Sequence, residues 1–209
     1  MRRLVTALVG LAVIGALFAS YYGVHAQEQV GCSLDNPSAA RIVACSKIMG
    51  GGGLSDGQMA SALFNRGAAY DDEHQYKLAI KDYTEVIRLR PDFATAFNAR
   101  GSAYDEDNQL DNALADYSEA IRLNPDATLA AYAWANRALL EMRHGLLAQS
   151  LSDYNEALKK DSQNGWALYG RGIARLRAGD KAGGSADISA ANKIDPGIAK
   201  SYADIGIRP

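Results

Sequence analysis

The chain has 209 residues, of which 48% are hydrophobic and 22% are charged, and its formal net charge is −2. These values describe an ordinary soluble chain that is long enough for one sizeable core. Because Lys and Arg are spread along the chain beside Asp and Glu, no basic face stands out, and the sequence predicts no nucleic-acid partner.

The N-terminus has the pattern of a cleaved secretory signal. Two arginines follow Met1, an apolar or small run covers Leu4–Phe18, and Val24-His25-Ala26 supplies small residues where a signal peptidase cuts. The alternative is an uncleaved membrane anchor, which needs about 20 apolar residues, and Leu4–Phe18 falls short of that length. We therefore expect a signal peptide over residues 1–26, and contact with a membrane only if this segment is retained.

Both cysteines, Cys32 and Cys45, lie in the next segment, residues 27–59. In an oxidising compartment two such cysteines usually pair, and the loop of about 14 residues that they close would constrain the unfolded chain by about 3 kcal/mol. Two unpaired thiols are the alternative, and a zinc site would have too few ligands because no His is near. We expect a disulfide between Cys32 and Cys45.

From Ala60 onward one pattern recurs with a period of about 34 residues. Steps of three, four and seven between apolar or small residues predict two helices per unit, broken by a polar turn and ended by a proline. In the unit over residues 94–127 these positions are Phe97, Gly101, Tyr104, Ala113, Tyr117, Ala120 and Pro125. Each unit is predicted to be a helical hairpin whose apolar face only its neighbours can cover.

This pattern resembles the tetratricopeptide repeat, in which an aromatic residue or Leu is followed by a small residue, Tyr, Ala, an aromatic residue, Ala and Pro. The first unit matches with Leu63, Gly67, Tyr70, Ala79, Tyr83, Val86 and Pro91. The third keeps Trp134, Ala138, Tyr154 and Ala157, and the fourth keeps Leu168, Gly172, Ala191 and Pro196. The resemblance implies an all-α, right-handed solenoid with repeats at 60–93, 94–127, 128–164 and 165–197.

The two ends are expected to cap this solenoid. Residues 45–49 align on residues 83–87, so the segment 27–59 contains a degenerate half-repeat with Cys45 at the aromatic position. Residues 198–209 begin like a further first helix, with Tyr202 at the aromatic position. The cysteine-containing cap resembles exported tetratricopeptide proteins of Gram-negative bacteria, which implies a periplasmic location. A membrane-anchored form facing the periplasm is the alternative.

An Arg and an Asp recur in every unit, separated by sixteen residues. The pairs are Arg66 and Asp82, Arg100 and Asp116, Arg137 and Asp153, and Arg171 and Asp187. Since a single active site would need only one such pair, repetition favours a structural ladder of ion pairs over chemistry. Solvated, unpaired charges are the alternative, and exposed pairs would each add at most about 1 kcal/mol.

The sequence offers little for catalysis. The histidines are His25, in the predicted signal, and His74 and His144, each in a predicted turn. The run Gly50–Gly53 lacks the Lys and Ser or Thr of a nucleotide-binding loop, and no His/Cys spacing fits a metal. We expect no enzyme activity, no cofactor and no metal site.

The remaining candidate is the concave face, which first helices form in this family. The resemblance places ten residues of interest on it, namely Phe64, Asp71, Asn98, Asp105, Tyr132, Leu139, Arg143, Trp166, Tyr169 and Arg177. This groove would be acidic at its N-terminal end and aromatic and partly basic at its C-terminal end, a composition that suits binding. Alternatively, Tyr132, Trp166 and Tyr169 pack between units or against residues 198–207. The Lys and Arg set by which relatives clamp a C-terminal carboxylate is missing, because Phe64 stands where a Lys is needed.

The resemblance implies a non-enzymatic, exported interaction module that holds a peptide or helix of an envelope protein in its groove. An assembly subunit that self-associates through an end repeat is a second hypothesis. An enzyme or small-molecule receptor is a third, which the lack of convergent titratable groups disfavours. Fold alone does not decide between these.

Overall fold

The computed structural model describes residues 31–123 and 127–208. In these ranges it contains ten helices and no strand. In chain order the helices are α2 (Ser38–Gly50), α3 (Asp56–Asp72), α4 (Tyr76–Leu89), α5 (Ala94–Glu106), α6 (Leu110–Leu123), α7 (Ala127–Arg143), α8 (Leu147–Lys160), α9 (Gly165–Arg177), α10 (Lys181–Ile194) and α11 (Ile198–Asp204). The predicted signal peptide lies outside the described residues, so it stays a prediction.

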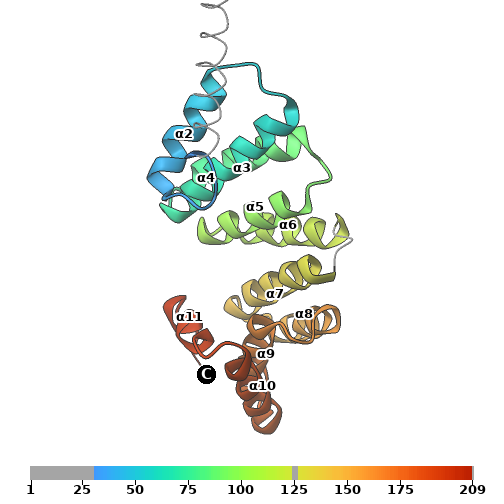
Figure 1. Cartoon of the computed structure of the whole chain (residues 1–209). Coiled ribbons are helices and arrows are strands. Elements are labelled where there is room, and N and C mark those ends of the chain that lie inside the picture. Colours follow the sequence, from blue (N-terminus) through green and yellow to red (C-terminus); the bar gives the residue numbers. More distant parts are fainter. Residues whose placement is uncertain (1–30, 124–126, 209) are drawn as a thin grey trace, which may run out of the picture. The chain divides into compact units, whose positions relative to one another are not determined.

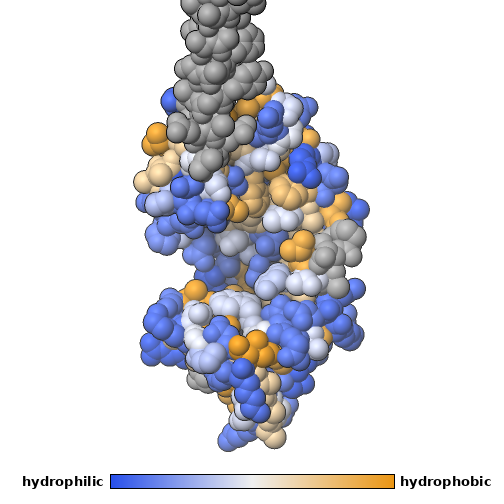
Figure 2. Space-filling view, viewed as in Figure 1, coloured by the Kyte–Doolittle hydropathy of each residue, from blue (hydrophilic) through white to orange (hydrophobic). Residues whose placement is uncertain are grey.

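The chain divides into two compact units, which we describe separately. The first unit ends at Arg90 and contains α2, α3 and α4 (Figure 1). The second begins at Pro91 and contains α5 to α11. On the face shown in Figure 2, hydrophilic residues cover much of the surface and small hydrophobic patches interrupt them.

In the first unit α3 and α4 form a hairpin, and α2 packs against α3. The start of α3 is fixed by a capping box, in which Ser55 and Gln58 each accept a hydrogen bond from the other's backbone N–H. The hairpin closes tightly at Gly67, where an added Cβ would lie 2.8 Å from the Tyr83 ring. This is the close approach that the small residue of the motif predicts.

The predicted disulfide between Cys32 and Cys45 is present in the first unit. Cys45 lies on the buried side of α2, and Cys32 lies in the turn that precedes this helix. Both cysteines belong to a small core with Ile48 and Ala62. The bridge therefore fixes the chain before α2 against this small core.

In the second unit three hairpins follow one another, formed by α5 with α6, α7 with α8, and α9 with α10. The second helix of a hairpin also packs on the first helix of the next, as α6 does on α7 and α8 on α9. The main core spans α7 to α11 and includes Tyr154, Ile173 and Tyr202, all fully buried. This arrangement confirms the predicted all-α helical repeat solenoid.

The Arg–Asp ladder is also confirmed, because each Arg contacts the Asp of its own hairpin through Nε and Nη2. The Nε–Oδ2 distances are 2.7 Å for Arg66, 2.7 Å for Arg100, 2.6 Å for Arg137 and 2.7 Å for Arg171. The Nη1 atoms of Arg66, Arg137 and Arg171 also donate to the second helix that precedes each of them. The acceptors there are Ser46 for Arg66, Ser118 for Arg137 and Asn155 for Arg171. Each of these three guanidinium groups therefore joins three helices.

Candidate functional site

First helices of the second unit present a small hollow to solvent. The hollow has a volume of about 220 Å³ and lies between α5, α6 and α7. Two large apolar residues of α7 border the hollow, and both are about half-exposed: the exposed fraction is 49% for Leu129 and 48% for Tyr132. Tyr132 is therefore open to a partner, in contrast to the fully buried Tyr154 of the core.

Two amides join α5 and α7 beside Tyr132. The Asn136 side-chain amide donates to the Oδ1 atom of Asn98 over 3.2 Å, and both residues line the hollow. An Asn side chain offers two donors and an acceptor with two lone pairs, so each amide keeps capacity for a further hydrogen bond. The hollow thus combines apolar walls with polar groups that suit a peptide backbone.

Charged groups of the same helices pair with one another. Arg143 of α7 donates to Asp105 of α5 over 2.7 Å and lies 3.7 Å from Glu106. Burial raises the pKa of Asp105, while the positive charge of Arg143 acts in the opposite direction. Asp105 and Arg143, both predicted groove residues, therefore neutralise one another in this structure.

The aromatic residues of α9 are covered, which differs from what we expected for Tyr169. Tyr169 is only 3% exposed, and its ring lies 4.8 Å from that of Tyr202, measured between centroids. The ring centroids of Trp166 and Tyr202 lie 4.3 Å apart, and the Tyr202 hydroxyl donates a hydrogen bond to the Trp166 backbone carbonyl. Leu139 packs against the same core. Because α11 supplies Tyr202, this helix occupies the place where a partner would reach Tyr169. Of the three groove residues predicted on α9, only Arg177 is exposed.

The predicted residues of the first unit are tied to their own core. Phe64 packs on Tyr83 with 5.6 Å between ring centroids, and Asp71 accepts a hydrogen bond from the Tyr83 hydroxyl. Burial raises the pKa of Tyr83, and the negative charge of Asp71 raises it further. Beside them the buried Arg41 of α2 pairs with Asp72. The signal for this pair was an Arg at the position where the second-helix motif has Ala.

Sequence reasoning also assigned no role to Glu141, which the structure buries. Glu141 stands at the Tyr position of the motif, and its carboxyl lies beside Asp153. Burial, then the Asp153 charge, raises the pKa of Glu141 to about 7. The signal was a charged residue at a core position of the repeat.

Within residues 31–123 and 127–208, no cluster of three or more His, Cys, Asp or Glu side chains could hold a metal ion. Over the same part of the chain, none of the helices has the length and apolar character that crossing a bilayer requires.

The fold and this face define a protein of stacked helical hairpins with an open, uncharged hollow between two first helices. Tetratricopeptide repeat models match residues 60–93, 94–127 and 135–197. The chain belongs to the tetratricopeptide repeat family. No curated protein matches it.

Solved structures share the fold at low sequence identity. A fragment of MamA from Desulfovibrio magneticus RS-1 superposes with a TM-score of 0.67 at 16% identity, covering 83% of this chain and 94% of that one. YrrB gives 0.58 at 18% identity, covering 81% of this chain and 84% of that one. The first tetratricopeptide domain of Spaghetti gives 0.54 at 24% identity, covering 61% of this chain and 99% of that one.

Proposed function

We propose that this protein is a non-enzymatic interaction module that holds a segment of a protein partner against α5 and α7. The observation that carries the proposal is the exposure of Tyr132 at the edge of a hollow that Asn98 and Asn136 also line. A hollow of about 220 Å³ is smaller than the range of about 300–1,000 Å³ typical of small-molecule sites. It suits one side chain of a protein segment, with the two amides beside the backbone.

Peptide binding is known for proteins of this fold. YrrB is described as having an unusual peptide-binding site, and the Spaghetti domain was solved with the HSP90 peptide SRMEEVD. The acidic tail of that peptide is not the ligand we propose here, because this chain has Phe64 where a Lys of the carboxylate clamp is needed. The partner segment instead presents an apolar side chain to Tyr132.

We further propose that the partner belongs to the cell envelope and that the protein is exported to the periplasm. The signal pattern of residues 1–26 and the Cys32–Cys45 disulfide support export, because disulfides persist in oxidising compartments. In this proposal residues 27–59 and 198–209 are the end caps of four repeats at 60–93, 94–127, 128–164 and 165–197.

Affinity capture with the mature chain, residues 27–209, tests the proposal. The bait is incubated with an envelope extract beside a Tyr132→Ala variant, and bound proteins are identified by mass spectrometry. Leu78→Ala is the matched control, since Leu78 is also an exposed large apolar residue but lies on the second helix α4. A protein that binds the wild type and the control, and is lost with Tyr132→Ala, supports the proposal.

If the wild type, Tyr132→Ala and Leu78→Ala all captured the same proteins, binding at Tyr132 would be contradicted. Direct titration of the purified candidate partner then serves as the second measurement. We expect Tyr132→Ala to weaken that complex about tenfold or more, since exposed aromatic anchors dominate interface energies.

Self-association through α2 is a second candidate function. Val43 on α2 is 68% exposed, and the nearby Leu34 is also exposed. Exposed apolar residues on and beside one helix suit a copy-to-copy contact. Mass measured against concentration tests this function: a concentration-dependent increase that Val43→Ser abolishes would support it, and a constant monomer mass would exclude it.

A further inference from the structure

The short helix α11 packs on α9 in the second unit (Figure 1). Three apolar side chains of α11 and of the turn after it are buried in the main core, namely Ile198, Tyr202 and Ile207. The Tyr202 ring lies against those of Trp166 and Tyr169, and its hydroxyl donates to the Trp166 backbone carbonyl. α11 therefore shows how a helix with one aromatic anchor and flanking aliphatic residues binds to α9.

α11 lacks the ladder arginine that joins other first helices to the helix before them. By the 34-residue period that places Tyr202 at the aromatic position of the motif, Ile205 aligns with Arg171. Arg171 binds both Asp187 of its own hairpin and Asn155 of the preceding second helix. The Ile205 side chain can make neither bond, and it is exposed instead.

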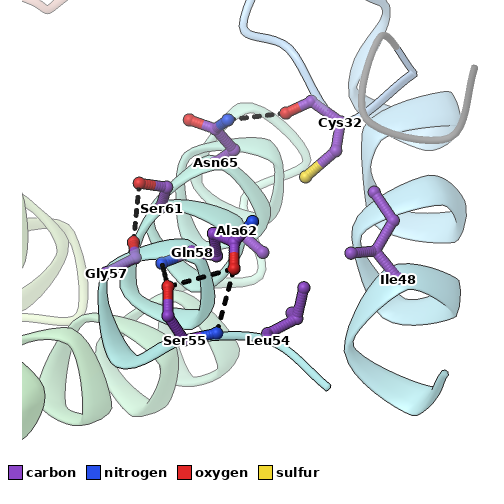
Figure 3. A pocket seen from close by; sticks show the side chains of 9 residues that line it. All are labelled: Cys32, Ile48, Leu54, Ser55, Gly57, Gln58, Ser61, Ala62 and Asn65. Carbon is purple, nitrogen blue, oxygen red and sulfur yellow. Dashed lines mark hydrogen bonds between the residues drawn. The ribbon is translucent and has the colours of Figure 1, made fainter. Parts of the chain in front are cut away.

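α11 also lacks a second backward hydrogen bond that some first helices make. Asn136 of α7 donates to α5, and the equivalent Asn65 of α3 donates to the Cys32 carbonyl over 2.6 Å (Figure 3). The equivalent residue of α11 is Asp204, whose carboxylate pairs with Lys200 of the same helix. α11 is therefore held on α9 by apolar packing and one tyrosine hydroxyl, without the polar connections of other first helices.

This mode of attachment allows α11 to open alone. The helix has only seven residues, and isolated helices shorter than about 12–15 residues are marginal in water. Opening α11 leaves the α7–α8 and α9–α10 hairpins and their ladder pairs in place, so it costs less than unfolding the unit. A competitor that reaches α9 then meets Trp166 and Tyr169, the rings on which Tyr202 lies.

A positive charge lies at the C-terminal end of α9. Arg177, in the last turn of this helix, is exposed and makes no ion pair with any residue that the structure describes. In the preceding pair of first helices the equivalent place is charged on both sides, because Arg143 of α7 donates to Asp105 in the last turn of α5. The end of α9 therefore offers a cation that a negatively charged partner would complement.

The register of the repeats indicates where the partner carries this charge. Arg143, which reaches the last turn of α5, lies nine residues after Trp134, and Trp134 aligns with Tyr202. A helix bound to α9 in the register of α11 therefore brings the residue nine positions after its tyrosine to the last turn of α9. A glutamate there would pair with Arg177.

We propose that the face of α9 beneath α11 is a second binding surface, which takes a helical segment of a protein partner in place of α11. The segment carries an aliphatic residue four positions before a tyrosine, as Ile198 precedes Tyr202, and an acidic residue nine positions after it. Its tyrosine packs on the α9 rings and its acid pairs with Arg177. α11 stays on α9 when no partner is present. The surface does not depend on the proposed site between α5 and α7.

The probe is a labelled synthetic peptide that copies residues 196–208, carries Gly206→Ala to remove a residue of positive φ, and continues with Ala-Ala-Glu. Its Glu stands nine positions after its Tyr. Fluorescence anisotropy measures binding to the chain of residues 27–209 and to its Tyr202→Ala variant. We expect at least about tenfold tighter binding to Tyr202→Ala, because α11 no longer competes for α9. Ile205→Ala, which changes an exposed residue beside α11, is the matched control and should bind like the wild type.

A second peptide that ends in Gln instead of Glu tests the role of Arg177. We expect the Glu peptide to bind about two- to fivefold more tightly, the gain from one exposed ion pair. Arg177→Gln should abolish this difference. Lys181→Gln, which removes an exposed cation at the start of α10, should preserve it. Equal binding of the two peptides to the wild-type chain would overturn the acidic segment as the ligand.

Hydrogen exchange of the wild-type chain tests the proposal even where Tyr202→Ala does not fold. We expect the Glu peptide, at saturating concentration, to speed exchange across residues 198–207 at least about tenfold, because it displaces α11 from α9. Exchange that the peptide leaves unchanged would overturn the proposal.

Tyr132→Ala and the measured mass separate this surface from the other candidate sites. Peptide binding that survives Tyr132→Ala supports the surface on α9, whatever partner binds beside α7. Binding that is lost with Tyr132→Ala and is equal for the wild type and Tyr202→Ala would support the proposed function and contradict the second surface. A mass that rises with concentration in the wild type but not in Tyr202→Ala would assign the surface to α11 of a second copy instead.

Discussion

Gly170 of α9 lies directly against the phenol of Tyr154, so that a Cβ atom added to Gly170 would lie 2.2 Å from the Tyr154 hydroxyl oxygen. Tyr154 is fully buried and cannot move away without disturbing the main core of the second unit. The absence of a side chain at residue 170 therefore sets the distance between α8 and α9.

Gly170→Ala should destabilise the protein by about 1–3 kcal/mol, because the added methyl overpacks a full core. Urea unfolding followed by circular dichroism measures this change. Gly57→Ala is the control, since its helical position has room for a Cβ and Ala favours a helix over Gly by about 0.5–1 kcal/mol. Equal stability of the two variants would show that α8 and α9 can separate at no cost.

Loss of one ladder carboxylate should cost far more than loss of an exposed one. Asp116→Asn leaves the guanidinium of Arg100, only 16% exposed, without its counter-charge, and we expect a loss of about 2–3 kcal/mol. Glu119→Gln, which breaks the exposed pair with Arg122, should leave stability nearly unchanged. Thermal unfolding of both variants compares them. A small effect of Asp116→Asn would mean that water replaces the pair.

Glu141 should make stability depend on pH. Burial, then the charge of Asp153, raises the pKa of Glu141 from 4.5 to about 7. Because the folded-state pKa lies above that of the unfolded chain, ionising Glu141 costs folding free energy. This cost is absent below about pH 4.5, grows as pH rises, and is complete above about pH 7.

Glu141→Gln should remove that cost, so the variant gains on the wild type as pH rises. We expect a gain on the order of 1–2 kcal/mol between about pH 4.5 and about pH 8, after allowance for screening by nearby solvent. Urea unfolding at the two pH values measures it. A stability difference that is the same at both would contradict a raised pKa in the folded state.

Removal of the disulfide should loosen the first unit. Reduction, or Cys32→Ser/Cys45→Ser, releases a loop of about 14 residues and should lower stability by about 3 kcal/mol. Hydrogen exchange should become faster across residues 32–49, where α2 packs on α3. Unchanged exchange there would mean that packing around Ile48 suffices to hold the cap.

Tyr169 and Tyr132 should behave oppositely on truncation. Tyr169→Ala removes a buried ring stacked on Tyr202 and should cost about 3–5 kcal/mol, the range for buried aromatic residues. Tyr132→Ala removes a half-exposed ring and should leave the melting temperature nearly unchanged. A stable Tyr169→Ala protein would show that α11 detaches easily, which would open α9 to a partner.

Features that depend on spacing within one repeat could be predicted from the sequence. The hairpins follow from the recurrence of a small residue at the Gly67 position of each unit, and the Arg–Asp ladder follows from a constant separation of sixteen residues. Spacing in the sequence could not predict which of the groove residues are exposed to solvent. Tyr169 is buried because Tyr202, more than thirty residues later, turns onto it, and no spacing rule gives the angle at which the short helix α11 packs.

Two buried charged residues were visible in the sequence only as departures from the motif. Glu141 replaces a Tyr, and Arg41 replaces an Ala. Their roles depend on neighbours from other helices, Asp153 for Glu141 and Asp72 for Arg41. A motif records which positions are buried, but it does not identify the neighbour that stabilises a charge there, as Asp72 does for Arg41, or opposes it, as Asp153 does for Glu141.

The hydrogen bonds from the ladder arginines to the preceding helix bear on how the number of repeats can increase during evolution. Three ladder arginines, Arg66, Arg137 and Arg171, each bind the Asp of their own hairpin and also a hydroxyl or amide of the preceding helix. That hydroxyl or amide belongs to the residue directly after the aromatic position of the motif, which Cys45 occupies in α2. A repeat copied in tandem by gene duplication would carry both halves of this connection, the Arg at its front and the acceptor at its back. The new copy could dock in register at once, without waiting for compensating mutations in its neighbours.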